Sequence, residues 1–369
     1  MKKTILIFAL SRSPWIGGIY YRKNIIHMML HNQTITEKYK IVVLTNEKYR
    51  SVFSVFEPDI DIVTCKDGTG VAKALMSAIK CCMKYKTRYV FPIRPFGFFR
   101  LFGITPVSWI ADFQHCHYPD FFEKSEVDAR NKNFKKMISA KNPLVVSSKD
   151  AERDLHTYFG SRNNVYVVHF TSYIDEDIKE LNKLNNDEIL NKYDLVNKQY
   201  IAVCNQFWQH KNHKVVLEAI KLLVKKNKSL SYRFVFTGEP SDRRNPKYID
   251  EIRTLLNDPS IKEYVSVLGF IDRQDQLCIM KHSQFLIQPS LFEGWGTVVE
   301  DAKQLGKRVL LSDIPVHQEQ KNDSCILFDP HDPEKLSILI EEMINYSKDL
   351  PKPVDSTVEY AKVLSEIFK

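Results

Sequence analysis

The sequence contains no long hydrophobic run, no paired cysteine motif and few glycines. No apolar stretch approaches the ~20 residues that a transmembrane helix needs, so we expect any membrane contact to be peripheral. The seven cysteines include no CxxC pair. This pattern is typical of free thiols in a reducing compartment, and we predict a cytoplasmic protein. Only 12 of the 369 residues are glycine, so two glycines in one short loop indicate a backbone that needs the conformational freedom of glycine there.

Two common kinds of site are also missing from the sequence. Neither half of the chain carries GxGxxG after its first predicted strand, which gives a nicotinamide dehydrogenase little support. His115 and His117 form an HxH pair, but no third ligand follows at a recognisable spacing. We therefore predict no metal and no cofactor. The opening MKKTILIFAL has too short an apolar run, and no cleavage site, for a signal peptide, so we predict a first core strand there.

The positive charge of the chain is concentrated at its start. The formal net charge is +8, whereas residues 1–100 alone contain 17 Lys or Arg and 6 Asp or Glu. A localised surplus favours an anionic partner such as a phospholipid surface or a polyprenyl phosphate, and it is equally typical of a solvated lysine-rich face. We expect only weak binding to nucleic acid.

The length and the hydrophobic pattern predict an α/β protein of two domains. Short apolar runs alternate with helical patterns, as in βαβ units with a parallel sheet. We predict Rossmann-like domains at residues 1–175 and 199–350, facing a central cleft, with a linker at 176–198 and a closing amphipathic helix at about 355–369. The predicted strands are TILIFAL, KIVVLT, DIVTC, YVFPI, PVSWIAD, PLVVSS and VYVVHF, then YIAVCN, YRFVFTG, YVSVLGF, SQFLIQPS, RVLLSD and CILFDP.

Three loops that lead from a predicted strand into a predicted helix are candidates for anion binding, because helix N-termini favour negative charge. The first carries Gly17 and Gly18, which permit close backbone approach or a plain turn. The second, CNQFWQHKNHK, places Lys211 just before a helix. The third, LFEGWGTVVEDA, turns at its two glycines, and a helix begins near Thr297.

The spacing within this last helix distinguishes two adjacent acids. At 100° per residue, Asp301 lies one turn beyond Thr297 on the same face, beside the glycine turn. Glu300 lies nearly opposite Val298, which belongs to the predicted core-facing stripe, so we expect Glu300 to face solvent.

The segment PSLFEGWGTVVEDAKQLGKRVLLSDIPVHQEQ resembles the donor-site motif of the retaining nucleotide-sugar glycosyltransferases of family GT4, which have the GT-B fold. CNQFWQHKNH, VFTGEPSD, VLGFI, SWIADFQHCHYPDFF and WIGGIYY resemble other segments of the same family, so the resemblance spans nearly the whole chain. It implies a hexosyltransferase that works without a metal ion and acts in the synthesis of a bacterial surface polysaccharide (O-antigen or capsule). The implied donor is a nucleotide-diphosphate sugar, and the implied acceptor is a lipid-linked glycan. It also implies that the last helix crosses back to the first domain.

The resemblance assigns a role to individual residues of this chain. Glu293 would bind hydroxyls of the donor sugar, Lys211 the phosphates and Asp301 the ribose. The remaining donor-site residues that it implies are the first-domain glycines Gly17 and Gly18, the turn residue Gly238, the base-reading Phe270 and Ile271, and the diphosphate-binding N–H groups of Gly294, Trp295, Gly296 and Thr297.

Two positions depart from the family pattern. The second acid of the motif is usually glutamate, so Asp301 is one methylene shorter. Gln206 stands where members usually carry a basic residue, which removes one positive charge from the diphosphate site, and Arg243 or Arg244 is a candidate replacement. These departures keep open the alternative of a catalytically weak, membrane-associated partner subunit. A sugar-nucleotide epimerase with the GT-B fold is the other alternative.

The reaction that the resemblance implies requires stabilisation of developing charge and no protein nucleophile. Cleavage of a sugar–phosphate bond develops negative charge on the leaving diphosphate, which Lys211 and the helix N-terminus at Thr297 would stabilise. Asp112 and His115 in the first domain would position or polarise the acceptor, or they form a hydrogen-bonded structural pair. The aromatic, arginine-containing run FPIRPFGFFRLFG favours docking on the membrane, although a packed loop has the same composition.

Overall fold

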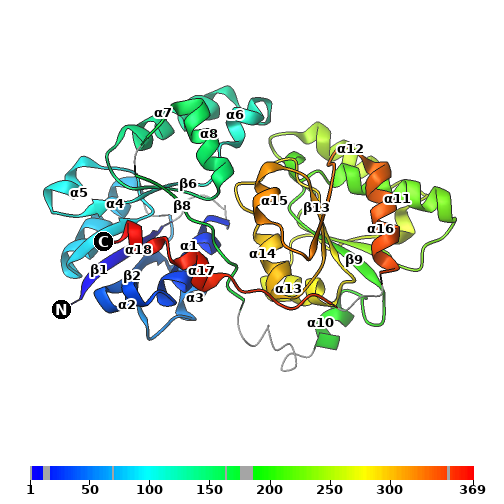
Figure 1. The fold of residues 1–369 in the computed structure, drawn as a ribbon, viewed down its shortest axis with the longest axis horizontal. Coiled ribbons are helices and arrows are strands. Elements are labelled where there is room, and N and C mark those ends of the chain that lie inside the picture. Colours follow the sequence, from blue (N-terminus) through cyan, green and yellow to red (C-terminus); the bar gives the residue numbers. More distant parts are fainter. Residues whose placement is uncertain (1, 11–16, 69, 163, 175–185, 347–349) are drawn as a thin grey trace. The chain divides into compact units, whose positions relative to one another are not determined.

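The structure is a computed structural model that describes residues 2–10, 17–68, 70–162, 164–174, 186–346 and 350–369. The chain forms two compact units (Figure 1). Unit 1 comprises Met1–Cys116, Lys124–Tyr173 and Ser356–Lys369, and unit 2 comprises His117–Glu123 and Ile174–Asp355. The predicted linker at 176–198 lies outside the described residues up to position 185. Beyond it, α10 (Asn186–Lys192) packs within unit 2.

Unit 1 is built on parallel strands with the order of a doubly wound fold. Its first sheet has the order β3-β2-β1-β4-β5, and a second sheet has the order β6-β7-β8. Each predicted apolar run contains a strand, and the apolar side chains are mostly buried in β1, β2, β4 and β7 and partly buried in β3 and β8. The strands are β1 (Lys3–Ala9), β2 (Tyr39–Asn46), β3 (Ile60–Cys65), β4 (Thr87–Phe91), β5 (Thr105–Pro106), β6 (Ser108–Ile110), β7 (Leu144–Val146) and β8 (Val165–Val167).

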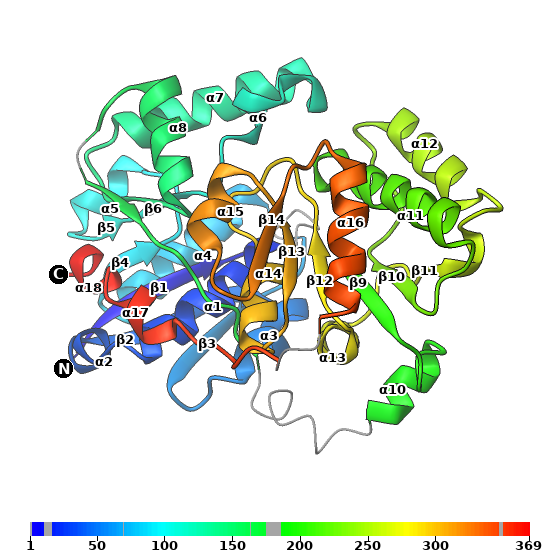
Figure 2. The ribbon, with the colours of Figure 1, turned by 45° about the vertical axis from the view of Figure 1, so that its right-hand side comes forward.

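The helices of unit 1 cover its sheets (Figure 2). They are α1 (Gly17–Leu30), α2 (Gln33–Lys38), α3 (Arg50–Ser54), α4 (Val71–Lys84), α5 (Gly97–Leu101), α6 (Gln114–His117), α7 (Lys124–Ser139) and α8 (Lys149–Phe159). None of the described helices is long and apolar enough to cross a membrane.

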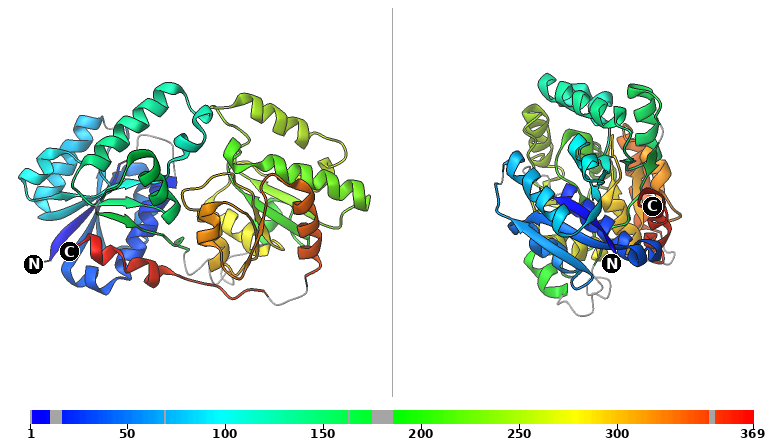
Figure 3. Two further views of the ribbon diagram at one scale, coloured as in Figure 1. Left: turned by 45° about the horizontal axis from the view of Figure 1, so that its top comes forward. Right: turned by 90° about the vertical axis from the view of Figure 1, so that its left-hand side faces the viewer.

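The end of the chain returns to unit 1, as the resemblance implied (Figure 3). The predicted single helix is wrong, because the segment forms two short helices, α17 (Thr357–Ala361) and α18 (Leu364–Ile367). Their position is fixed by long-range polar contacts: Asn32 Nδ2 donates to the carbonyl of Ala361 at 2.7 Å, and Tyr89 Oη donates to that of Lys369 at 2.6 Å. These contacts to unit 1 outweigh the helical continuity that the local apolar spacing suggested.

Unit 2 repeats the doubly wound arrangement around a six-stranded parallel sheet of order β11-β10-β9-β12-β13-β14. Its strands are β9 (Tyr200–Cys204), β10 (Arg233–Thr237), β11 (Val265–Val267), β12 (Leu286–Gln288), β13 (Val309–Ser312) and β14 (Cys325–Phe328). Its further helices are α11 (His213–Asn227), α12 (Pro246–Leu256), α13 (Arg273–His282), α14 (Thr297–Gln304), α15 (Pro315–Gln320) and α16 (Pro333–Ile344). The predicted α/β fold class is confirmed.

Candidate functional site

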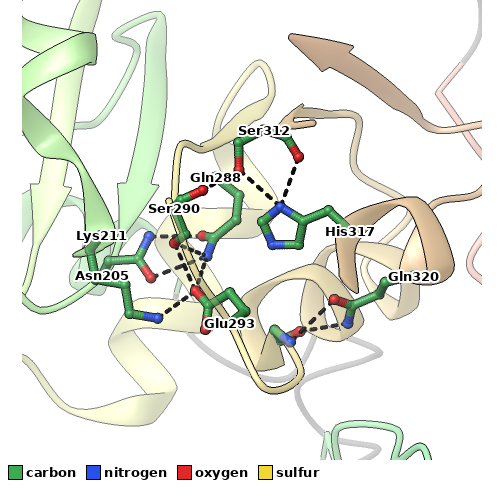
Figure 4. A network of polar contacts seen from close by, with 9 residues as sticks. Asn205, Lys211, Gln288, Ser290, Glu293, Ser312, His317 and Gln320 are labelled. Atoms are coloured by element: carbon green, nitrogen blue, oxygen red, sulfur yellow. Dashed lines mark hydrogen bonds and ion pairs between the residues drawn. The ribbon is translucent and has the colours of Figure 1, made fainter. Parts of the chain in front are cut away.

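The candidate site of unit 2 lies at the point where its strand order reverses. Strands β9 and β12 are neighbours in the sheet, and the loops that follow them lead in opposite directions. Such a switch point is where doubly wound sheets bind ligands. The two strand ends are joined by side-chain amides, since Asn205 Nδ2 donates to Gln288 Oε1 at 2.8 Å (Figure 4). The loop after β9 carries Lys211 and the loop after β12 carries Glu293.

Lys211 and Glu293 form an ion pair at this switch point. Lys211 Nζ lies 2.5 Å from Glu293 Oε1, and the two side chains are 15% and 9% exposed. The same oxygen accepts hydrogen bonds from Gln288 Nε2 at 2.9 Å and Ser290 Oγ at 2.7 Å. Among the described residues none donates to the other oxygen, Oε2. Glu293 is thus held by one oxygen and has the second available for a ligand.

The charge of Glu293 predicts a pH dependence of stability. Burial alone would raise the pKa of Glu293, but the charge of Lys211 and its hydrogen bond lower this pKa to about 2. A depressed pKa means that the carboxylate stabilises the fold above its unfolded pKa and that this contribution is lost as the pH falls toward 2. We expect urea unfolding of wild type and Glu293→Gln to differ by about 3 kcal/mol near pH 6, with the difference shrinking by pH 3. A difference independent of pH would contradict this assignment.

The N-terminus of α14 presents backbone donors next to Glu293. Among the described residues, none accepts a hydrogen bond from the backbone N–H of Gly294, Thr297 or Val298. These three groups are only partly buried. The N–H groups of a first helical turn, together with the helix dipole, favour an anion. An anion held there would lie beside Lys211.

The N–H of Gly296 is not available to a ligand, contrary to our prediction. It donates to Oε1 of Gln320 in α15 at 3.2 Å, and Gln320 Nε2 donates back to the Gly296 carbonyl at 2.8 Å (Figure 4). A Cβ at position 296 would lie 3.0 Å from Gln320 Oε1. The Gln320 side chain approaches Gly296 closely, and its two hydrogen bonds fix the turn before α14.

The predicted orientation of the adjacent acids was wrong for Glu300. Its side chain is buried at 2% exposure, where Lys303 Nζ lies 2.9 Å and Gln320 Nε2 lies 2.8 Å from its Oε1. Burial raises its pKa, against the opposing effect of Lys303. Asp301 is fully buried and forms an ion pair with Arg273 of α13. Its other oxygen, Oδ2, is buried and has no hydrogen-bond partner among the described residues.

Gly238 is required by the close packing of the loops after β9 and β10. It has φ +115°, and a Cβ there would lie 2.1 Å from the carbonyl oxygen of Asn205. Its N–H donates at 2.7 Å to the carbonyl of Gly269, which places the adjacent Phe270 and Ile271 beside this turn. Phe270 is 63% exposed, which is unusual for a phenylalanine and compatible with a planar ligand.

Substitution of Gly238 by alanine is predicted to disrupt the site through the backbone. The clash with the Asn205 carbonyl and the positive φ act together. We expect Gly238→Ala to lower the free energy of unfolding by more than ~3 kcal/mol in urea titration. Gly97→Ala is the matched control, because nothing lies within 4 Å of a Cβ built there. Equal effects of the two changes would contradict the assigned role of Gly238.

Gln206 stands where a basic residue was expected, and Arg244 was a candidate to supply the missing charge. Both side chains contact other residues of unit 2. Gln206 Oε1 accepts a hydrogen bond from the backbone N–H of Glu239 at 3.1 Å. Arg244 Nε lies 3.2 Å from Asp242 Oδ1, and its guanidinium stacks over the Trp208 ring at 5.3 Å. Gln206 therefore supports the loop after β10, and the charge of Arg244 is balanced by an acid of its own loop.

The predicted residues of unit 1 form local contacts. Gly17 and Gly18 begin α1, whereas the preceding loop residues 11–16 lie outside the described part of the chain. Asp112 Oδ1 accepts from the backbone N–H of Gln114 at 3.0 Å. His115 is buried, and its Nε2 lies 3.0 Å from Asn131 Oδ1. Among the described residues no group of three His, Cys, Asp or Glu is arranged to hold a metal ion.

Several site residues were missed by the sequence reasoning. Gln288 had a readable signal, because it is polar at the carboxyl end of an apolar strand. His317 and Gln320 lie at the end of the segment that resembles the family motif, but no role was predicted for them; they reach the site from α15, and Gln320 is 24 positions from Gly296. Arg273 was likewise invisible, because its partner Asp301 comes from a different helix.

Comparisons with known proteins relate part of the chain to glycosyltransferases. Residues 185–362 match the family glycosyl transferases group 1. O-antigen chain mannosyltransferase B from Escherichia coli is 23% identical over 150 residues, which cover 40% of this chain and 38% of that protein. The match thus spans well under half of the relative's length.

Solved structures resemble the whole chain in fold. A glycosyltransferase from Rickettsia africae has a TM-score of 0.66 at 16% identity, covering 100% of this chain and 94% of that one. HepE from Anabaena, in complex with UDP and glucose, has a TM-score of 0.65 at 12% identity, covering 99% and 95%. The fold is therefore the GT-B fold of these structures, and residues 185–362 match the glycosyl transferases group 1 family. The match of residues 185–362 agrees with the resemblance that the sequence showed to glycosyltransferases, and assignment to the retaining family GT4 stays a prediction.

Proposed function

We propose that the protein is a retaining glycosyltransferase that moves a sugar from a nucleotide-diphosphate sugar to a glycan acceptor. The observation that carries the proposal is the juxtaposition of free N–H groups at the N-terminus of α14 with the Lys211–Glu293 pair. The N–H groups and Lys211 suit a diphosphate, and the unoccupied Oε2 of Glu293 suits a sugar hydroxyl.

The proposed chemistry follows from charge development at the sugar–phosphate bond. As this bond breaks, negative charge grows on the diphosphate and positive charge on the anomeric carbon. Lys211 and the α14 N-terminus would stabilise the departing diphosphate. Retention would result from attack on the face from which the diphosphate leaves, with a phosphate oxygen accepting the proton of the acceptor hydroxyl. No protein nucleophile is needed in this scheme.

The acceptor is proposed to be a lipid-linked glycan of a bacterial surface polysaccharide. The support is the name of the Escherichia coli relative, an O-antigen chain mannosyltransferase, and the concentration of basic residues in the first 100 positions. In this scheme Asp112 and His115 would position the acceptor.

Acceptor-dependent turnover tests the proposal against its alternatives. Calorimetry with UDP-glucose, UDP-N-acetylglucosamine and GDP-mannose should identify a donor, and an extracted polyprenyl-linked glycan should then trigger release of the nucleoside diphosphate. Interconversion of the nucleotide sugar without acceptor would instead indicate an epimerase. Nucleotide-sugar binding without either reaction would indicate a catalytically weak partner subunit.

We also propose that unit 1 contacts an anionic membrane through the outer surface of α4 and α5. The sequence from Gly68 to Ala111 contains seven Lys or Arg and no Asp or Glu. Leu101 and Phe102 are 85% and 55% exposed, and Met76 and Met83 on α4 are also exposed. Both helices pack on the same core cluster. Exposed apolar side chains among basic ones are typical of interfacial membrane binding.

This membrane contact predicts the behaviour of a double variant. Leu101→Ser with Phe102→Ser should weaken cosedimentation with phosphatidylglycerol vesicles by about tenfold or more, because two apolar side chains no longer enter the interface. The matched control is Ile338→Ser, which removes an exposed apolar residue of α16 in unit 2. Equal binding of the double variant and wild type would exclude this surface.

A further inference from the structure

His317 has a buried ring nitrogen for which the described residues offer no partner. The residue lies in α15 and is fully buried. Its Nδ1 lies 3.0 Å from both the carbonyl oxygen and the Oγ of Ser312 (Figure 4). Its Nε2, on the other side of the ring, has no hydrogen-bond partner in the described part of the chain. Buried polar atoms are rarely left in this state, so the atom calls for an explanation.

The contacts of Ser312 determine which ring nitrogen carries the proton. Ser312 Oγ lies 2.6 Å from the carbonyl oxygen of Ser290, to which it donates its only hydrogen. The carbonyl oxygen of Ser312 can only accept. Nδ1 of His317 must therefore be the donor toward Ser312. In the neutral ring Nε2 then has a lone pair and no hydrogen, so it can only accept.

The ring stays neutral although a carboxylate is nearby. Burial lowers the pKa of His317 to about 4, and the charge of Glu293 opposes this effect only in part. Ser290 links the two residues, because its carbonyl oxygen accepts from Ser312 Oγ at 2.6 Å and its own Oγ donates to Glu293 Oε1 at 2.7 Å (Figure 4). Two acceptors, Nε2 of His317 and Oε2 of Glu293, thus lie in one region of the site without a donor from the described residues.

We propose that Nε2 of His317 accepts a hydrogen bond from a hydroxyl of the donor sugar, next to the hydroxyl that Glu293 binds. A sugar with two neighbouring hydroxyl groups supplies the two missing donors at once. His317 is then a specificity-determining residue that selects donors with a free hydroxyl at this carbon. The inference rests on the proposed function, because it requires a nucleotide sugar at this site.

Substitutions can separate the contribution of the acceptor at Nε2 from that of the contact between Nδ1 and Ser312. His317→Asn keeps a side-chain N–H near the position of Nδ1, which preserves the bond to Ser312, and removes the atom at Nε2. His317→Gln restores an acceptor near the position of Nε2. Ser312→Ala removes the contact between Nδ1 and Ser312 Oγ and leaves the acceptor Nε2 of His317 in place. Thermal unfolding establishes that each variant is folded.

The test is a double-mutant cycle that combines substitution of His317 with removal of single hydroxyl groups from the donor sugar. The probes are whichever of UDP-glucose, UDP-N-acetylglucosamine and GDP-mannose the wild type uses, and its monodeoxy analogues. We expect His317→Asn to lower kcat/KM by ~10-fold to 100-fold with the full sugar and to leave binding of the free nucleoside diphosphate unchanged. For one monodeoxy analogue the substitution should cause no further loss, and His317→Gln should recover part of the activity.

The outcomes distinguish the inference from the function on which it depends. Losses that add for every monodeoxy analogue, or an equal loss of affinity for the free nucleoside diphosphate, would overturn the role of His317. If His317→Asn does not fold, the same cycle with His317→Gln decides, because an altered preference among the analogues is expected and an unchanged one would overturn the inference. Absence of nucleotide-sugar binding by the wild type would overturn the proposed function itself.

Discussion

Glu293→Gln is expected to lower kcat/KM for sugar transfer by ~10²-fold to 10³-fold. The amide keeps the shape of the side chain but removes the charge that balances Lys211 and weakens the acceptor that would bind the sugar hydroxyl. Because Oε1 holds three protein donors, the substitution also disturbs Gln288 and Ser290. Affinity for the free nucleoside diphosphate should persist, since Lys211 is then released from its ion pair.

The control for this prediction is Glu334→Gln, which removes an exposed carboxylate in the first turn of α16. Steady-state kinetics of both variants at saturating acceptor give the comparison. Wild-type kcat/KM in a folded Glu293→Gln protein would remove Glu293 from the site.

Lys211→Met is expected to lower kcat by about 10²-fold, because one positive charge is lost from the leaving diphosphate. Methionine retains much of the buried aliphatic length, so packing around the loop after β9 changes little. The substitution leaves the carboxylate of Glu293 without its cation, which should make the double variant with Glu293→Gln less impaired than the product of the two single losses.

Lys225→Met is the matched control for Lys211→Met, since Lys225 is exposed near the end of α11. Single-turnover measurements separate the chemical step from product release. If Lys211→Met changed only KM, with kcat intact, Lys211 would contribute to ground-state binding and not to stabilisation of the leaving group.

The strands and the two-domain fold were predictable from the sequence because their signal is local. The runs TILIFAL and YIAVC are almost entirely apolar, and β1 and β9 are the buried central strands that such runs predict. The loops that carry Lys211 and Glu293 follow strands, so their position at one edge of the sheet was predictable as well.

The environment of α14 was not predictable, because it depends on parts of the chain that are distant in sequence. The spacing favoured Val298 as the core residue, whereas Val299 is the fully buried one. The helix is buried on more than one side: Arg273 covers Asp301 and Gln320 contacts Glu300. An amphipathic pattern predicts correctly which side of a helix faces the core only when a single face of that helix is covered.

A structure of the protein with the bound nucleotide sugar that it uses tests the central claim most directly. The account predicts diphosphate oxygens on the N–H groups of Gly294, Thr297 and Val298 and near Lys211, with a sugar hydroxyl on Oε2 of Glu293. A nucleotide sugar bound elsewhere, with these groups free of it, would contradict the account.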